Sequence, residues 1–600
     1  MTQQSTNRER LAGMGAIVAD GGVAFRVWAP HAETVSVFGE FNDWDTDANA
    51  LESEGNGFWY GFVEGAEPGQ GYKFHLTNGD FGADRIDPYA LEVTNSVGHG
   101  VIHDHSRFDW EDDSANCPPH HELVIYEMHV GTFFRAADDA EVGSFDDVAA
   151  HLDHLKELGV NALQIMPVAE FAGDLSWGYN PAHIFAVESS YGGPESFKNL
   201  IKQAHRRGLA VILDVVYNHF GPSDLDLWQF DGWSENGKGG IYFYNDHRSA
   251  TPWGDTRPDY GREEVRRFIH DNAMMWLRDY HLDGLRLDMT PYMRSVDGSA
   301  FDLEDGWGLM RWINESVRQE FPGRIMIAED LHGHDRVVGL EDHGAGFHAQ
   351  WDAEFVHPVR EALTTMADEH RSLEAVAAAV AHNFDGDPLR RVIYTESHDE
   401  VANGSARVPH EIDPVDQEGY HAAKRSTVGG ALVMTSPGIP MIFQGQEILE
   451  GGWFSDDDPL DWERSERFRG IELLYKNLID LRLNRSGVTR GLTGRGLNVF
   501  HVNDDDNVIA FQRWLDHGPG DDVVVVVNLH NSAYADYRIG MPAEGLWKLR
   551  FNSDASLYSK LFGDHDGFDV TAFSEDEDNM PAHANIDIGP YSVLIYSQDA

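Results

Sequence analysis

The stretch Asp283-Gly-Leu-Arg-Leu-Asp-Met-Thr-Pro291 carries the chain's clearest combination of charges for chemistry. It follows a long amphipathic segment and reads as a short buried strand, in which Leu285 and Leu287 would pack inward on one layer with Arg286 and Asp288 between them. Residues two apart on a strand point to the same face, so both charges would project together at the mouth of a barrel. A neighbouring cation favours the ionised form of a carboxyl group, which is the form that attacks C1 of a sugar. A purely structural Arg–Asp pair explains this stretch, taken alone, equally well.

Three further apolar runs end in polar residues of the same kind. They are Asp214 and His219 after residues 209–213, Glu329 after 325–328, and His398 and Asp399 after 392–395. Three carboxylates at strand ends are the minimum for a retaining glycosidase, in which one attacks, one protonates the leaving oxygen and one orients the sugar. The attacking and protonating carboxyl groups of such an enzyme lie about 5–5.5 Å apart.

Glu329 fits the acid/base role because an apolar strand precedes it. Poor hydration there would raise its pKa, as acid/base catalysis near neutral pH requires. A structural charge at a helix N-terminus is the alternative for this residue. A divalent-metal site is the alternative for the whole set, but no His-x-His or two-His-one-carboxylate spacing is present.

The middle of the chain predicts a (β/α)₈ TIM barrel over residues 113–483, because strand and helix patterns alternate about eight times. The expected strands are 123–127, 161–167, 209–214, 283–288, 325–329, 392–395 and 439–443, with a weaker one at 346–351. Helical spacing of apolar residues is clearest at 148–158, 197–204 and 265–276. The aromatic, Gly-rich loop at 220–260 is too long for a plain connection, and loops of that length are usually functional.

Two all-β regions flank the predicted barrel. Short alternating strands over residues 1–112 predict an N-terminal β-sandwich, whose Trp44, Trp59 and Tyr60 we expect in its core rather than on a sugar-stacking platform. The polar segment 109–119 reads as a linker. Strands at 508–514, 523–528, 546–551 and 591–596 predict a C-terminal all-β domain over 484–600, with a mobile acidic loop at 564–581.

The composition excludes several classes of partner. A formal net charge of −56 over 600 residues repels nucleic acid and anionic membrane surfaces but permits a neutral glycan. The single cysteine, Cys117, rules out an intrachain disulfide and reads as an incidental linker residue. The N-terminus is polar and lacks the apolar segment typical of a signal peptide, and no apolar run is long enough to span a membrane, so we expect a cytoplasmic protein. We also expect a monomer.

Four ordered segments resemble the signature motifs of the α-amylase superfamily. They are Asp214-Val-Val-Tyr-Asn-His219, Gly284-Leu-Arg-Leu-Asp288, Ala328-Glu329 and Ser397-His-Asp399, and the N-terminal pattern FRVWAP…VSVFGEFNDW resembles the sandwich module of related enzymes. The resemblance implies that Asp288 is the nucleophile, Glu329 the general acid/base and Asp399 the third carboxylate. It implies that Arg286, His219 and His398 contact the sugar in the central subsite and that Tyr179 is the aromatic platform under it. Asp214, which with His219 follows the third strand, is expected to bind the substrate as well, because an Asp and a His together can bind sugar hydroxyl groups.

Other segments resemble two different groups of enzymes within this superfamily. The C-terminal pattern from Asp536 to Tyr558, Gly445-Gln-Glu447 and Pro459-Leu-Asp-Trp462 resemble 1,4-α-glucan branching enzymes. Thr251-Pro-Trp-Gly-Asp255 and the segment 214–222 look more like trehalose-releasing hydrolases, and Trp177-Gly-Tyr-Asn-Pro181 departs from the branching pattern.

We therefore expect a retaining branching enzyme that acts on amylose, starch, glycogen or maltooligosaccharides. A hydrolase of α-1,4 or trehalose-terminal linkages is the first alternative, and a non-catalytic glycan-binding protein on the same fold is the second. No cofactor is expected. Asn218 matches a calcium-ligating position of some amylases, but the rest of that site is not visible in the sequence.

The acidic excess also resembles the solvated surface of a salt-adapted protein, and this hypothesis predicts a salt response. Screening reduces the mutual repulsion of surface carboxylates, so stability and activity should both rise from low to molar salt. Thermal unfolding and activity measured across that range test the prediction. Flat behaviour would contradict it.

Overall fold

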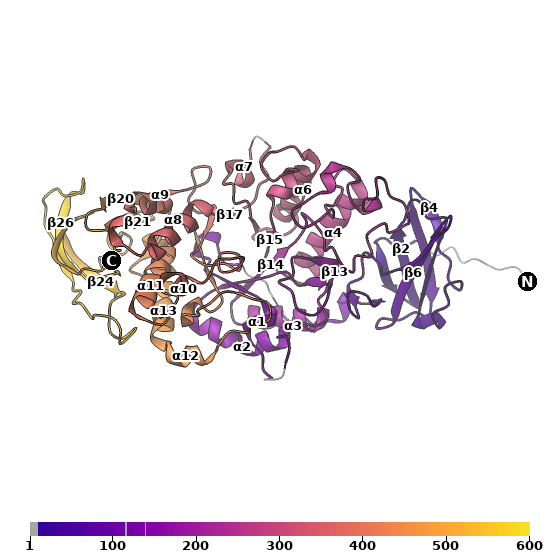
Figure 1. The fold of residues 1–600 in the computed structure, drawn as a ribbon, viewed down its shortest axis with the longest axis horizontal. Coiled ribbons are helices and arrows are strands. Elements are labelled where there is room, and N and C mark those ends of the chain that lie inside the picture. Colours follow the sequence, from indigo (N-terminus) through magenta and orange to yellow (C-terminus); the bar gives the residue numbers. More distant parts are fainter. Residues whose placement is uncertain (1–9, 114–116, 138–139, 342) are drawn as a thin grey trace, which may run out of the picture.

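The computed structural model describes residues 10–113, 117–137, 140–341 and 343–600. A β module at the N-terminal end, a central barrel and a C-terminal β domain follow one another along the longest axis of the molecule (Figure 1). This arrangement confirms the predicted fold class. The N-terminal residues 1–9, and residues 114–116 of the predicted linker, lie outside the described residues.

Eight parallel strands close into the barrel in the order in which they occur in the chain. All eight expected strands are present, including the weak one. They are β10 (Ile125–Met128), β11 (Ala162–Ile165), β14 (Ala210–Val215), β15 (Gly284–Leu287), β16 (Ile325–Ala328), β17 (Ala349–Trp351), β18 (Arg391–Ile393) and β19 (Ile439–Phe443). Because the strands are parallel, the residues that follow them collect at one end of the barrel.

The pairing of β15 with its neighbours places its charged residues inside the barrel. Arg286 is in register with Asp214 on β14 and with Ile327 on β16. Leu285 and Leu287 belong to the core that includes the surrounding helices, so the expectation that they pack inward was wrong. Gly284 is required at this position, because a Cβ there would lie 2.3 Å from the carbonyl oxygen of Ile325.

Helices cover the outside of the barrel. The long ones are α2 (Phe145–Leu158), α3 (Gly193–Arg206), α4 (Glu263–Asp279), α6 (Glu304–Glu320), α8 (Ala353–Thr364), α9 (Leu373–Ala381), α11 (Tyr420–Thr435) and α13 (Arg469–Arg482). The short ones are α1 (Val130–Phe133), α5 (Pro291–Arg294), α7 (Asp335–Val338), α10 (Val408–Ile412) and α12 (Glu463–Arg467). A capping box between Ser144 and Asp147 starts α2, and Gly159 ends it in the left-handed conformation. Within the described ranges, none of the helices combines the length and apolar character needed to cross a bilayer.

The N-terminal module consists of two antiparallel sheets. One contains β1 (Gly15–Ala19), β2 (Gly22–Trp28), β5 (Phe58–Glu64) and β4 (Glu52–Gly55), and the other β3 (Thr34–Gly39), β6 (Gly71–Asn78), β7 (Phe81–Arg85), β8 (Glu92–Val93) and β9 (Gly100–Val101). Tyr60 is buried and Trp59 is partly buried, whereas Trp44 is 38% exposed, so the expectation of a core position fails for Trp44.

Part of the long loop at 220–260 packs against this module. Arg85 donates hydrogen bonds to the carbonyl oxygens of residues 228–230, and a carboxylate oxygen of Asp226 accepts a hydrogen bond from the Ile86 amide. The hairpin of β12 (Ala169–Phe171) and β13 (Pro181–Val187) lies between β11 and α3 in the chain.

The C-terminal domain has a six-stranded and a two-stranded sheet. The first contains β20 (Gly496–Asn503), β21 (Val508–Trp514), β22 (Val523–Asn528), β27 (Ser592–Ser597), β24 (Gly545–Asn552) and β25 (Val570–Ala572), and the second β23 (Tyr534–Met541) and β26 (Ala582–Ile588). β25 lies within the segment 564–581, which was expected to be a loop throughout. The strand could not be recognised from the sequence, because it has only three residues, pairs at the edge of the sheet and lies within an acidic segment.

A buried histidine connects the start of β15 to the segment before the barrel. His205 on α3 contacts Asp113 at 2.9 Å through Nδ1 and Asp283 at 2.9 Å through Nε2. Asp283 also accepts hydrogen bonds from the Val211 amide and from Arg324. Burial opposes protonation of His205, but the charges of Asp283 and Asp113 raise its pKa.

We predict that His205→Gln lowers stability by about 1–3 kcal/mol at pH 6, the scale of hydrogen bonds to charged groups. The pKa is raised in the folded state, so this stabilisation is complete below the unfolded-state value of about 6.5 and is lost as the pH rises through the folded-state value. The difference from wild type should therefore be smaller at pH 9. Urea unfolding at both pH values measures it, with the exposed His247→Gln as control; an equal loss at both pH values would contradict the prediction.

Candidate active site

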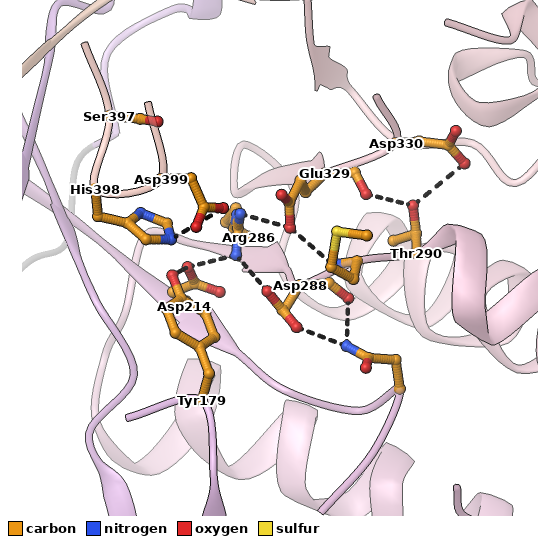
Figure 2. Close-up of polar contacts among 12 residues, drawn as sticks. Tyr179, Asp214, Arg286, Asp288, Thr290, Glu329, Asp330, Ser397, His398 and Asp399 are labelled. Atoms are coloured by element: carbon orange, nitrogen blue, oxygen red, sulfur yellow. Dashed lines mark hydrogen bonds and ion pairs between the residues drawn. The ribbon is translucent and has the colours of Figure 1, made fainter. Parts of the chain in front are cut away.

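Arg286 lies at the centre of the polar cluster at the C-terminal end of the barrel strands (Figure 2). Its Nη1 donates to Asp214 at 2.6 Å and to Asp288 at 3.1 Å, and its Nη2 lies 2.7 Å from Glu329 Oε2. The Arg286 side chain is fully buried. A single guanidinium therefore holds three acidic side chains that come from three adjacent strands.

Glu329, which follows β16, combines burial with one unused oxygen. Oε2 accepts a hydrogen bond of 2.8 Å from the Met289 amide, whereas Oε1 is buried and has no hydrogen-bond partner among the described residues. Burial raises the pKa of Glu329 well above its usual range; Arg286 opposes this effect, and Asp288 and Asp399 add to it. A protonated carboxyl group with a free oxygen can donate a proton to a bound ligand.

The backbone around Glu329 is held on both sides. Met289 has φ of +37°, a left-handed conformation that is costly for a side-chain-bearing residue and directs its amide toward Glu329. Thr290 donates through its amide and its hydroxyl group to the Glu329 carbonyl oxygen. Asp330, the next residue, forms a two-point ion pair with Arg294 at 2.8 and 3.0 Å.

Both carboxylate oxygens of Asp288 accept hydrogen bonds. Oδ1 faces Arg286, and Oδ2 accepts from the Asn218 side-chain amide at 2.6 Å. The residue is only 5% exposed. Asn218, which the family resemblance connected with calcium, thus contacts Asp288 directly. No group of three or more His, Cys, Asp or Glu side chains is arranged to hold a metal ion within the part of the chain that the structure describes.

His398 and Asp399 lie on the opposite side of Arg286 from Asp288 (Figure 2). His398 Nε2 is 3.5 Å from Asp399, whose side chain is 45% exposed. His398 Nδ1 is 2.8 Å from Glu127 Oε1, and the His398 amide donates to Glu127 Oε2. Burial disfavours the imidazolium form, but Asp399 and Glu127 raise the pKa of His398 to about 9.

Tyr179, Asp214 and His219 form the remaining part of the cluster. The Tyr179 hydroxyl group donates to Asp214 at 2.7 Å, and the Tyr179 ring stacks on His398 with centroids 5.0 Å apart. Burial raises the pKa of Asp214 to about 7, although Arg286 opposes the shift. His219 Nε2 lies 2.9 Å from the Tyr179 carbonyl oxygen, and its Nδ1 lies 2.5 Å from Asn218 Oδ1.

Gly178 allows Tyr179 to reach this place. Its φ is +92°, and a Cβ at this position would lie 2.2 Å from the Pro167 carbonyl oxygen. The loop therefore passes close to the end of β11, and only glycine fits there.

The structure thus brings all eight of the predicted site residues together. It also adds three that the sequence analysis missed. Glu127 orients His398, the Trp351 ring lies 4.4 Å from the Arg286 guanidinium carbon, and Trp253 of the long loop stacks on His219 with centroids 4.6 Å apart. Glu127 was detectable, because it is a charge that ends an apolar strand. Trp253 and Trp351 carried no such signal.

Three family models match the chain. "Carbohydrate-binding module 48 (Isoamylase N-terminal domain)" matches residues 13–90, "Alpha amylase, catalytic domain" residues 131–248, and "Alpha amylase, C-terminal all-beta domain" residues 500–599. Each model falls in one of the three structural parts.

Curated relatives named "1,4-alpha-glucan branching enzyme GlgB" match nearly the whole chain. The enzyme from Photobacterium profundum is 31% identical over 90% of this chain and 77% of its own length. The enzyme from Salinibacter ruber is 30% identical over 93% of this chain and 92% of its own. The enzyme from Corynebacterium jeikeium is 30% identical over 91% and 78%.

Solved structures share the fold at lower identity. A pullulanase complexed with maltotetraose from Anoxybacillus sp. LM18-11 has a TM-score of 0.77 at 22% identity, covering 98% of this chain and 87% of that one. A putative alpha amylase from Salmonella typhimurium has a TM-score of 0.74 at 23% identity, covering 98% and 100%.

We predict that Arg286→Leu destabilises the protein by about 3–5 kcal/mol at pH 8, because buried carboxylates lose their shared cation. Without that cation the carboxyl pKa values of the folded state rise, so the variant binds protons on folding and recovers stability as the pH falls. Its deficit relative to wild type should therefore shrink at pH 5. Urea unfolding of both proteins tests this, with the exposed Arg311→Leu as control. A deficit independent of pH, or one equal to that of the control, would refute the prediction.

Proposed function

Because the chain belongs to the α-amylase family, we propose that it is a 1,4-α-glucan branching enzyme, which cleaves an α-1,4 linkage and transfers the released chain to a 6-hydroxyl group of a glucan. The extent of the match carries this proposal. Relatives of that name align with 90% or more of the chain, including both flanking β regions and not the barrel alone. The pullulanase and amylase structures are below 25% identity and support the fold only.

The first half of the proposed reaction forms a covalent glucosyl-enzyme. One Asp288 oxygen attacks C1 while the bond from C1 to the leaving O4 breaks, and Glu329 gives its proton to O4. The contacts of these groups support the assignment, since Arg286 and Asn218 orient Asp288 and the unpartnered Oε1 of Glu329 is available to the sugar oxygen. The raised pKa of Glu329 keeps it protonated for this step.

The second half returns the enzyme to its starting state. The oxygen of an acceptor 6-hydroxyl group attacks C1, Glu329 takes the hydroxyl proton, and the bond to Asp288 breaks. Asp399, with its exposed side chain, and His398, with its raised pKa, offer an acceptor and a charged donor to the hydroxyl groups of the same sugar. The ring of Tyr179 provides an apolar surface beside them.

A hydrolase that uses water as the acceptor is the second candidate. Trp253 favours it, because the segment 251–255 resembles trehalose-releasing hydrolases and the structure places this tryptophan on His219, beside the cluster. The ratio of glucan transfer to hydrolysis depends on how well the loops hold a glucan acceptor and exclude water.

We expect new α-1,6 signals with few new reducing ends when the protein is incubated with amylose. Anomeric protons measured by NMR, together with a reducing-end assay, distinguish the outcomes. Reducing ends that rise without α-1,6 signal would mean hydrolysis. Asp288→Asn should abolish both products and Trp312→Ala, at an exposed site on α6, should abolish neither. Full turnover by Asp288→Asn would refute Asp288 as the nucleophile, and a wild-type protein that forms neither product would favour a glycan-binding protein without this chemistry.

A further inference from the structure

A cavity of about 630 Å³ lies at the N-terminal end of the barrel strands, the end opposite to the carboxylate cluster. Three of its walls are segments that immediately precede strands: 117–121 before β10, 346–348 before β17 and 387–390 before β18. The rest of the lining comes from Arg318 of α6, Gly323, Val338, Leu340 and Arg495. None of the residues that line it contributes to the candidate active site.

Cationic side chains collect in this cavity, although the chain as a whole carries a net charge of −56. Arg390 pairs with Asp385 at 2.6 Å, and Arg495 pairs with Asp387 at 3.0 Å. Arg318 has no acidic side chain within ion-pair distance among the described residues, and its one hydrogen bond goes to the Gly346 carbonyl oxygen at 2.7 Å. Its remaining donors are free in a protein that otherwise has carboxylates in excess.

A neutral histidine adds a hydrogen-bond donor on a defined ring nitrogen. His348 Nδ1 accepts a hydrogen bond of 2.9 Å from the Met326 amide, so the neutral ring carries its proton on Nε2. Burial lowers the pKa of His348 to about 3, with His120, Arg318 and Arg390 acting in the same direction. The ring is therefore neutral at physiological pH and carries one N–H group. Arg318 and Arg390 both lie near enough to the ring to contribute to its lowered pKa.

The shape and the donors together indicate the class of ligand. A single guanidinium can satisfy a carboxylate, whereas several cations and an imidazole N–H from different elements suit an anion with several terminal oxygens. The lining carboxylate, Asp387, is already occupied by Arg495 and by the Leu389 amide. Pro119, Leu340 and Phe347 contribute apolar side chains to the wall. The cavity volume lies within the range of about 300–1,000 Å³ typical of small-molecule sites.

We propose that this cavity binds a small organic phosphate, whose phosphate group contacts Arg318, Arg390 and His348 and whose uncharged part lies against Pro119, Leu340 and Phe347. The site is separate from the glucan site, so binding there does not depend on the proposed branching activity.

The only cysteine of the chain provides a local reporter, because Cys117 lines the same cavity. Burial raises the pKa of its thiol to about 12, so modification by N-ethylmaleimide is slow and is best followed at pH 9. Saturating glucose 6-phosphate should slow the modification of the wild-type protein at least threefold at low ionic strength, and glucose should have no effect. An unchanged rate would overturn the proposal without reference to any variant.

Calorimetric titration of the full chain gives the second arm of the test. Glucose 6-phosphate should bind with one-to-one stoichiometry and more tightly than inorganic phosphate, and Arg318→Gln and Arg390→Gln should each weaken binding at least tenfold. Arg107→Gln, on an exposed side chain of the N-terminal region, is the matched control. Equal affinity for inorganic phosphate would overturn the organic part of the proposal. Absence of saturable binding, or variants that bind like the control, would overturn all of it.

Discussion

The candidate active site depends on one buried guanidinium. Arg286 is fully buried inside the barrel, and it contacts acidic groups from β14, from the end of β15 and from the end of β16. Removing one partner from such a group leaves uncompensated charge in a poorly hydrated interior, which is strongly unfavourable. The three strands must therefore lie next to one another in the observed register for any of these charges to be tolerated.

Shared contact with Arg286 does not make the acidic groups equivalent. Glu329 is buried with one oxygen unpartnered and Asp288 is held by donors on both oxygens. Asp399, which forms no ion pair with Arg286, has a side chain that is 45% exposed. Different surroundings are how carboxyl groups of one chemical type take different roles in one site. Around them, Glu127 orients His398, and the ion pair of Asp330 with Arg294 holds the backbone after Glu329. The geometry of the cluster thus depends also on residues outside the eight that the sequence predicted.

Several arginines are buried in the interior, away from the carboxylates of the surface. Arg391, Arg482 and Arg513 are fully buried between the barrel and the C-terminal domain, where they donate mainly to backbone carbonyl oxygens. Cations used in this way do not offset carboxylates at the surface. Acidic side chains are buried in similar number, so the acidic excess of the chain remains at its surface. The cationic cavity at the N-terminal end of the barrel stands out against that acidic surface.

The sequence by itself determined the fold class, the eight barrel strands and the eight residues expected in the site. A charged residue that follows an apolar strand can be recognised from the local sequence. Because all strands of the barrel are parallel, such residues lie at the same end of it, however the side chains pack. Tertiary structure alone decided that Leu285 and Leu287 face the helices, that Asn218 serves Asp288, and that Trp253 and Trp351 reach the cluster. These outcomes depend on register and on contacts between residues far apart in the chain. The spacing of residues along one segment does not record such contacts, because loop paths and strand neighbours are set by the packing of the whole barrel.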